Sequence, residues 1–228
     1  ETVYLDIGEE SRPIGAAIEF LEDPSGKLTI TEITSPAYAG RFIRSNRPAP
    51  NFGLGDTVYW LRFSMADRNP GLGDWLIEQP YPLMNSFDLY LPLPNGTYRM
   101  QRYFYSPEAP WAPLPHRNPF FALPLTTQPT TFYIRASVGS ILTFPLVVKA
   151  RDTFLSQNSL SVLGYGLYFG VMLTIALYNL YLAIIFRDRV YLSFTAYVLL
   201  FALLQMSLHG FLRQYLFPSW PDLDNQIL

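Results

Sequence analysis

Cysteine is absent from the 228-residue sequence, which excludes a disulfide-stabilised scaffold and any thiol chemistry. Histidine is scarce: only His116 and His209 occur, so the chain has no histidine cluster to hold a catalytic zinc ion. Basic residues form no cluster and the net charge is −2, so we expect no nucleic-acid partner. The Walker A loop and a complete Gly-x-Gly-x-x-Gly motif are also missing, which excludes two common nucleotide-binding motifs.

Charged residues make up only 15% of the chain, compared with about 25% in typical soluble domains. No Asp, Glu, Lys or Arg occurs between Leu160 and Phe186, or between Val190 and Leu212. Each stretch exceeds the roughly 20 apolar residues that cross the hydrocarbon core of a bilayer. Two buried core helices are the alternative, but buried helices of this length usually carry a polar stripe. We therefore predict transmembrane helices at residues 160–186 and 190–212.

The polar residues around these helices predict a topology. The turn at Arg187-Asp188-Arg189 contains two arginines, which favours a cytoplasmic position for this turn and places residues 1–159 outside. We interpret residues 153–159 as a juxtamembrane connector. Residues 213–228 are interpreted as an extracytoplasmic loop and the start of a truncated third helix.

Residues 1–152 have the pattern of an all-β domain. Between Thr57 and Met65, apolar and polar side chains alternate: Trp60 and Arg62 fall on one face, and Leu61 and Phe63 on the other. Many short β-rich runs follow, separated by turn residues such as Asn and Gly, which indicates a sandwich or barrel. The other expected strands are 2–5, 17–21, 28–33, 74–79, 86–91, 97–105, 119–125, 131–137 and 141–148.

Four segments resemble the 7TMR-DISM receptors, a family of bacterial seven-helix receptors that includes hybrid sensor kinases of the LadS/RetS type. They are Leu21-Glu22-Asp23-Pro24-Ser25-Gly26, Val58-Tyr59-Trp60-Leu61-Arg62-Phe63, Leu114-Pro115-His116-Arg117-Asn118 and Phe132-Tyr133-Ile134-Arg135. The resemblance implies a jelly-roll sandwich, similar to carbohydrate-binding modules, followed by the first helices of a seven-helix region. It also implies a cytoplasmic output such as a histidine kinase or a diguanylate cyclase, and a homodimer or other sensor kinases as partners beside membrane lipid.

A carbohydrate site is the first ligand hypothesis, because sugars bind flat aromatic side chains and bidentate polar groups. Trp111 is the sharpest aromatic candidate, since it lies in a proline-rich loop at 106–119; its alternative role is to plug the end of the sandwich. The polar candidates are Arg62, Arg135, His116 and Arg117. Arg62 shares a face with Trp60 and needs a partner if that face is buried, so a structural ion pair is the alternative.

Calcium is the second ligand hypothesis. The resemblance to jelly rolls of the carbohydrate-binding type favours it, because such domains often bind calcium through loop oxygens, and calcium takes six to eight oxygen ligands. Asp56 ends the Gly-rich segment 51–56 and is the candidate metal ligand, with a plain turn residue as the alternative. We expect no enzymatic activity in this chain; a polysaccharide hydrolase would need two carboxylates in one cleft, with Asp56, Asp67, Asp74 and Asp88 as candidates. A membrane-anchored carbohydrate-binding or adhesion module without signalling is the remaining alternative.

Four residues stand out in the predicted membrane helices. Gly166 and Gly170 form a small-xxx-small pattern that permits close helix packing. Gln205 and His209 are four residues apart, on one helix face, and polar groups at membrane depth usually face the interior of a helix bundle. Interhelical hydrogen bonding is their simplest role, and signal relay is the alternative.

Overall fold

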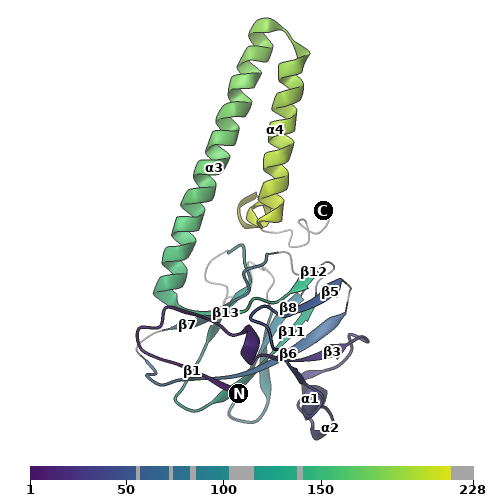
Figure 1. The fold of residues 1–228 in the computed structure, drawn as a ribbon, viewed down its shortest axis with the longest axis vertical. Coiled ribbons are helices and arrows are strands. Elements are labelled where there is room, and N and C mark those ends of the chain that lie inside the picture. The colour runs from purple at the N-terminus through teal and green to yellow at the C-terminus, as the bar shows by residue number, and fades with distance from the viewer. Residues whose placement is uncertain (55–56, 72–73, 83–85, 103–115, 138–140, 217–228) are drawn as a thin grey trace. The chain divides into compact units, whose positions relative to one another are not determined.

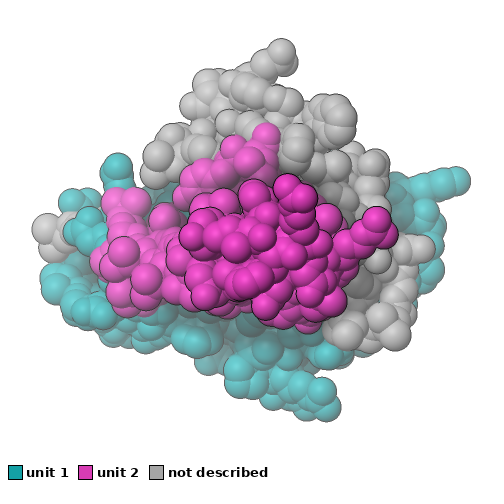
Figure 2. All heavy atoms as spheres, turned by 90° about the horizontal axis from the view of Figure 1, so that it is seen from above, with its two compact units in different colours: residues 1–153 teal, residues 154–228 magenta. Residues whose placement is uncertain are grey.

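The computed structural model describes residues 1–54, 57–71, 74–82, 86–102, 116–137 and 141–216 (Figure 1). The chain forms two compact units, residues 1–153 and 154–228, which Figure 2 colours separately. The first unit is rich in β-strands, and the second contains long apolar helices.

The first unit contains a large sheet of seven strands in the order β4-β3-β6-β11-β8-β9, with β1 beside β6. The long strand β6 organises this sheet, because its first half pairs with β3 and its second half pairs with β1 in parallel. Its other edge pairs with β11, which in turn pairs with β8. The strands are β1 (Thr2–Leu5), β3 (Glu19–Asp23), β4 (Ile43–Arg44), β6 (Val58–Asp67), β8 (Ser86–Pro92), β9 (Tyr98–Arg102) and β11 (Thr130–Ser137).

A four-stranded sheet in the order β10-β7-β13-β2 and a two-stranded sheet of β12 and β5 complete the described strands. The expected single strand at 141–148 is two strands in different sheets, β12 and β13, separated by the buried residues Phe144 and Leu146. The bounds are β2 (Ser11–Pro13), β5 (Asn51–Leu54), β7 (Trp75–Glu78), β10 (Phe120–Leu123), β12 (Ile141–Thr143) and β13 (Val147–Ala150), with a short 3-10 helix at Gly15–Ala17.

The hydrophobic core lies between the large and the four-stranded sheets. One cluster joins Leu61, Phe63 and Phe132 of the large sheet to Ile77 and Val148 of the smaller one, all at most 2% exposed. Alternation along each strand produces this core, because successive side chains point to opposite faces. The predicted β-sandwich is therefore confirmed, and the two faces of β6 carry the residues that the alternation assigned to each.

The outer face of the large sheet carries a second cluster, centred on Trp60, which is completely buried. Ile33 of the short helix α1 (Ile30–Ile33) packs in this cluster, and α2 (Pro36–Ala39) follows. The strand expected at 28–33 was wrong. Thr29 and Glu32 form a capping box, in which each side chain accepts a hydrogen bond from the other residue's backbone N–H, and this starts a helix.

The second unit contains α3 (Arg151–Phe186), α4 (Arg189–Leu208) and a π-helical turn at Leu212–Leu216. Both long helices have the length and apolar composition to cross a membrane. The 153–159 connector is helical, because α3 follows β13 with no residue between them. Asp188 caps α4 by accepting a 2.9 Å hydrogen bond from the backbone N–H of Val190.

The two long helices contact each other along a seam with partly buried residues every three or four positions, the spacing of antiparallel helix pairs. At the centre, Thr195 donates a long hydrogen bond (3.5 Å) to the carbonyl oxygen of Ala176, which is 2% exposed. The seam residues are Tyr165, Phe169, Met172, Ala176 and Asn179 of α3, and Tyr191, Thr195, Val198, Ala202 and Gln205 of α4.

Candidate functional site

Arg62 lies on the outer face of β6, the same face as Trp60, as the alternation predicted, and it forms the ion pair that was its alternative role. Its Nε donates a 2.7 Å hydrogen bond to Oε2 of Glu19, the residue opposite on β3. Nη1 donates to the carbonyl oxygen of Ala39 at 3.2 Å, and the guanidinium lies 4.2 Å from the ring centroid of Phe42. These contacts fix the position of the Arg62 guanidinium, which stays partly exposed on this face.

A hollow of about 430 Å³ opens on the outer face around Arg62. Hydroxyl groups line it on neighbouring strands: Ser64 and Thr131 are 2.8 Å apart, and both can donate or accept hydrogen bonds. Its size is within the range of small-ligand pockets. The lining residues are Glu1, Ala17, Glu19, Arg62, Phe63, Ser64, Tyr98, Thr131 and Tyr133.

Two tyrosines form an aromatic wall of this hollow. The rings of Tyr98 and Tyr133 meet edge to face, with centroids 5.6 Å apart. Burial, together with the interaction with Tyr133, raises the pKa of the Tyr98 hydroxyl, so this group stays neutral and able to donate a hydrogen bond. The hollow thus combines ring surfaces, neutral hydroxyls and one arginine–carboxylate pair.

Arg135 lies on the same outer face but is tied to the fold. Its Nη2 donates a 2.9 Å hydrogen bond to the carbonyl oxygen of Gly26, in the turn after β3. Across the strand pair lies Asp88, which is 2% exposed and forms a 3.3 Å ion pair with Arg102. Burial raises the pKa of Asp88, although Arg102 and Arg135 act in the opposite direction.

His116 and Arg117 lie together in the short segment before β10. Nδ1 of His116 is 3.1 Å from the backbone N and 3.0 Å from the backbone O of Asn118, and its ring meets that of Phe120 edge to face. Arg117 is half-buried beside it. These two candidates come just before β10, a strand of the four-stranded sheet, whereas Arg62 and Arg135 lie on the large sheet. The structure therefore does not bring the four polar candidates into one cluster.

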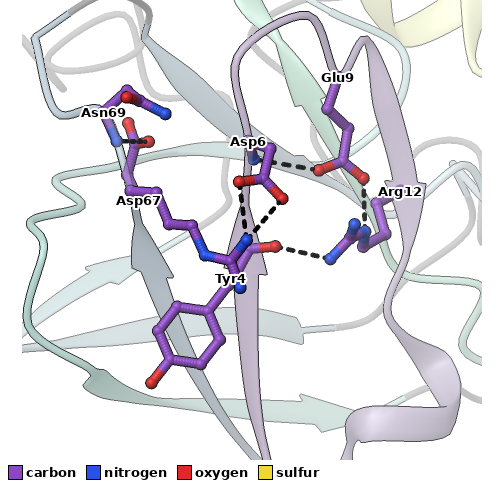
Figure 3. A network of polar contacts seen from close by, with 7 residues as sticks. Tyr4, Asp6, Glu9, Arg12, Asp67 and Asn69 are labelled. Carbon is purple, nitrogen blue, oxygen red and sulfur yellow. Dashed lines mark hydrogen bonds and ion pairs between the residues drawn. The ribbon is translucent and has the colours of Figure 1, made fainter.

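Trp111 and Asp56 lie outside the described residues. The described turn acids use their oxygens within the fold: Asp23 accepts from Ser25 and from the N–H of Leu28, and Asp67 accepts from the N–H of Asn69 (Figure 3). Within the ranges that the structure describes, no group of three His, Cys, Asp or Glu residues could hold a metal ion.

The other acidic candidates do not share a cleft. Asp67 follows Met65 on the inner face of β6, whereas Asp88 is on the outer face of β8. Asp74 pairs with Arg151, at the start of α3, with 3.0 Å between Nη1 and Oδ2. Nothing in these positions favours a pair of hydrolytic carboxylates.

Charged residues near the N-terminus also satisfy one another (Figure 3). Arg68 donates to both carboxylate oxygens of Asp6, at 3.0 and 3.2 Å. Arg12 donates to the carbonyl oxygen of Tyr4 at 2.7 Å and pairs with Glu9. This network links β1 to β2 and stabilises the edge of the first unit.

The membrane candidates occupy different faces. Nδ1 of His209 lies 2.9 Å from the carbonyl oxygen of Gln205, and its ring is 4.9 Å from that of Tyr165 on α3. Gly166 and Gly170 face away from this contact, because no described atom lies within 4 Å of a Cβ built on either glycine. The glycine pair therefore does not form the α3–α4 contact and remains a prediction about another helix.

Sequence reasoning missed several residues that the fold brings together. Ser64 and Thr131 belong to strands 67 residues apart along the chain, so only their cross-strand pairing reveals them. Tyr98 and Tyr133 meet in the same way. The alternation within each strand gave their common face, but not which strands are neighbours.

The described chain thus combines a β-sandwich that has a hollow on one outer face with two apolar helices of membrane-spanning length. Two family models match this chain: the one described as 7TMR-DISM extracellular 2 matches residues 15–149, and the one described as 7TM diverse intracellular signalling matches residues 161–228. The chain belongs to the 7TMR-DISM family, as the resemblance predicted. No curated protein matches the chain. It thus contains an extracellular sensory domain and a transmembrane region of a signalling receptor.

Proposed function

We propose that the chain is the ligand-sensing input module of a bacterial transmembrane receptor, and that a small carbohydrate binds in the outer-face hollow around Arg62. The observation that carries this proposal is the chemistry of the hollow. Ser64, Thr131, Tyr98 and Tyr133 present hydroxyls, two of them on aromatic rings, and the Glu19–Arg62 pair presents charged hydrogen-bonding groups. Sugar hydroxyls both donate and accept hydrogen bonds, so this mixture of groups suits them.

Calcium stays a candidate through Asp56 alone, which could act as a structural ion or as a second signal. The output that we propose is a histidine kinase or a diguanylate cyclase on the cytoplasmic side of the inner membrane, with the sandwich, a jelly roll, in the periplasm. Dimerisation with a second copy, or association with another sensor kinase, would follow from such an output. The description of the matched helical region as diverse intracellular signalling supports this proposal.

An adhesion module without signalling is the alternative. A simple anchor needs only one spanning helix, whereas the described part of this chain contains two. A polytopic membrane region therefore favours a receptor.

Sugar binding can be measured by thermal unfolding of the full chain in lipid nanodiscs, with EDTA, with calcium, and with a panel of neutral, amino and acidic sugars. A ligand at about 100 times its Kd adds roughly 2.7 kcal/mol of stability. Tyr98→Phe removes one hydroxyl from the hollow and should weaken sugar binding about five-fold, the effect of one net hydrogen bond of about 1 kcal/mol.

Tyr81→Phe is the matched control, because Tyr81 packs against the core and does not line the hollow. It should leave sugar affinity unchanged. Equal loss in both variants, or no stabilisation by any sugar, would overturn the carbohydrate proposal. A calcium shift that disappears in Asp56→Ala would instead identify calcium as the ligand.

A further inference from the structure

A buried chain of polar side chains links the segment before β10 to the strand that enters α3. The amide Nδ2 of Asn118 donates a 2.7 Å hydrogen bond to Oε1 of Glu78 in β7. The other carboxylate oxygen, Oε2, is 2.7 Å from Nζ of Lys149 in β13. One carboxylate thus bridges two segments that are 31 residues apart along the chain (118 and 149).

This bridge is shielded from solvent. The side chains of Lys149 and Glu78 are 16% and 5% exposed, which makes them the most buried ion pair among the residues that the structure describes. Asn118 is 8% exposed. Buried pairs are screened little by salt, and breaking one leaves an uncompensated charge. Moving Asn118 away therefore changes the energy of the Glu78–Lys149 contact.

The segment before β10 is also fixed to β7 through its backbone. The N–H of Gln79 donates to the carbonyl oxygen of Pro119 at 2.9 Å, and Phe120 pairs with Glu78 in the sheet. Nε2 of Gln79 donates to the carbonyl oxygen of Thr143 at 2.8 Å. A displacement of residues 116–119 is thus passed to β7.

Strand β13 is followed directly by α3 along the chain. Lys149 is followed by Ala150, the last strand residue, and by Arg151, the first helical residue. The N–H of Arg151 donates to the carbonyl oxygen of Asp74 at 2.9 Å. Lys149 is therefore only two residues from the start of α3, with no loop between them.

We propose that the Asn118–Glu78–Lys149 chain couples the His116–Pro119 segment to α3, so that a ligand contacting this segment is sensed at the start of the membrane helix. The proposal rests on the proposed sensory function and names the residues through which ligand binding would be transmitted to α3. It assigns Glu78 and Lys149 a signalling role that is separate from ligand contact.

Hydrogen exchange of the full chain in lipid nanodiscs tests this coupling without a ligand. Asn118→Ala should raise exchange at least about three-fold in residues 116–121 and also in the first two turns of α3. The matched control is Asn95→Ala, an exposed asparagine at the tip of the β8–β9 hairpin, which should leave α3 unchanged.

A second variant guards against general unfolding. Glu78→Gln keeps the size of the side chain and a hydrogen bond to Asn118 but removes the charge that holds Lys149. It should raise exchange in β13 and the first turns of α3 while residues 116–121 stay as in the wild type. If either variant changes exchange only in β7 and residues 116–121, the coupling is overturned, whereas the sugar titration would still decide the sensory function independently.

Discussion

The indole N–H of Trp75 donates a 3.0 Å hydrogen bond to Oδ2 of Asp67, which ties the four-stranded sheet to the end of the long strand of the large sheet. Both residues are buried, at 8% and 4% exposed. The other carboxylate oxygen of Asp67 accepts from the N–H of Asn69. Asp67, a candidate hydrolytic carboxylate in the sequence, is therefore a structural residue of the sandwich.

Trp75→Phe should lower the stability of the sandwich by about 1–3 kcal/mol, because a buried carboxylate oxygen loses its donor. The melting temperature, followed by near-UV circular dichroism of the full chain in nanodiscs, should fall by about 2–4 °C per kcal/mol. The control is a double-mutant cycle of Trp75→Phe, Asp67→Ala and the two changes combined, since alanine leaves no acceptor at position 67. If the two effects simply add, the hydrogen bond does not contribute to stability.

The raised pKa of Asp88 predicts that its contribution to folding stability falls as the pH rises. Burial raises the pKa of this carboxyl in the folded state, so the folded chain holds the proton more tightly than the unfolded chain. Stability from Asp88 is then greatest below the unfolded pKa of about 3.9 and falls as pH rises through the folded value.

Asp88→Asn removes this titration. The melting temperature of the variant should therefore rise relative to the wild type as pH increases from 3.5 to 7.5. A difference that is constant with pH, or that changes in the opposite direction, would contradict the raised pKa.

The lowered pKa of Asp23 predicts the opposite pH dependence of folding stability. Burial alone would raise its pKa, but hydrogen bonds from Ser25 and from the N–H of Leu28 lower it overall. Its stabilisation is thus present above pH 3.9 and is lost as pH falls through the folded pKa. Asp23→Asn should cost about 2 kcal/mol at pH 7 and much less near pH 2, because the lost bonds are to a charged acceptor. Thermal unfolding of both proteins at the two pH values measures this, and an equal cost at both would contradict it.

The helix seam predicts which small residue matters for the α3–α4 contact. Ala176→Leu should push the helices apart, because Ala176 is buried against Thr195. Gly170→Leu should not, since a Cβ there meets no described atom. Because the chain lacks cysteine, spin labels can be placed at the exposed Leu173 and Leu199 through introduced cysteines. Double electron–electron resonance then reports the distance, and a larger change in the Gly170 variant would refute the assigned seam.

The sequence by itself determined the features that depend on local periodicity. Alternation placed Trp60 and Arg62 on one face of β6 and Leu61 and Phe63 on the other, and two stretches without charge gave the apolar helices. Each of these patterns needs only neighbouring residues, since strand and helix geometry repeat over two and about 3.6 residues.

Local pattern failed where competing signals overlapped. Residues 28–33 look β-rich, but the capping box of Thr29 and Glu32 supplies two hydrogen bonds that a strand would not, and α1 forms instead. The run 141–148 looks like one strand, yet it divides between two sheets. For residues 28–33 the deciding interaction is a side-chain cap, which a propensity count does not weigh.

Only the tertiary structure decided which distant groups meet. Ser64 meets Thr131 in the hollow, and Asn118 and Lys149 share the carboxylate of Glu78, because particular strands pair in a particular register. Register depends on the packing of the whole core, which no single segment encodes. The sequence thus determined a β-rich domain followed by membrane helices, while the fold alone placed the candidate ligand hollow and the buried link to α3.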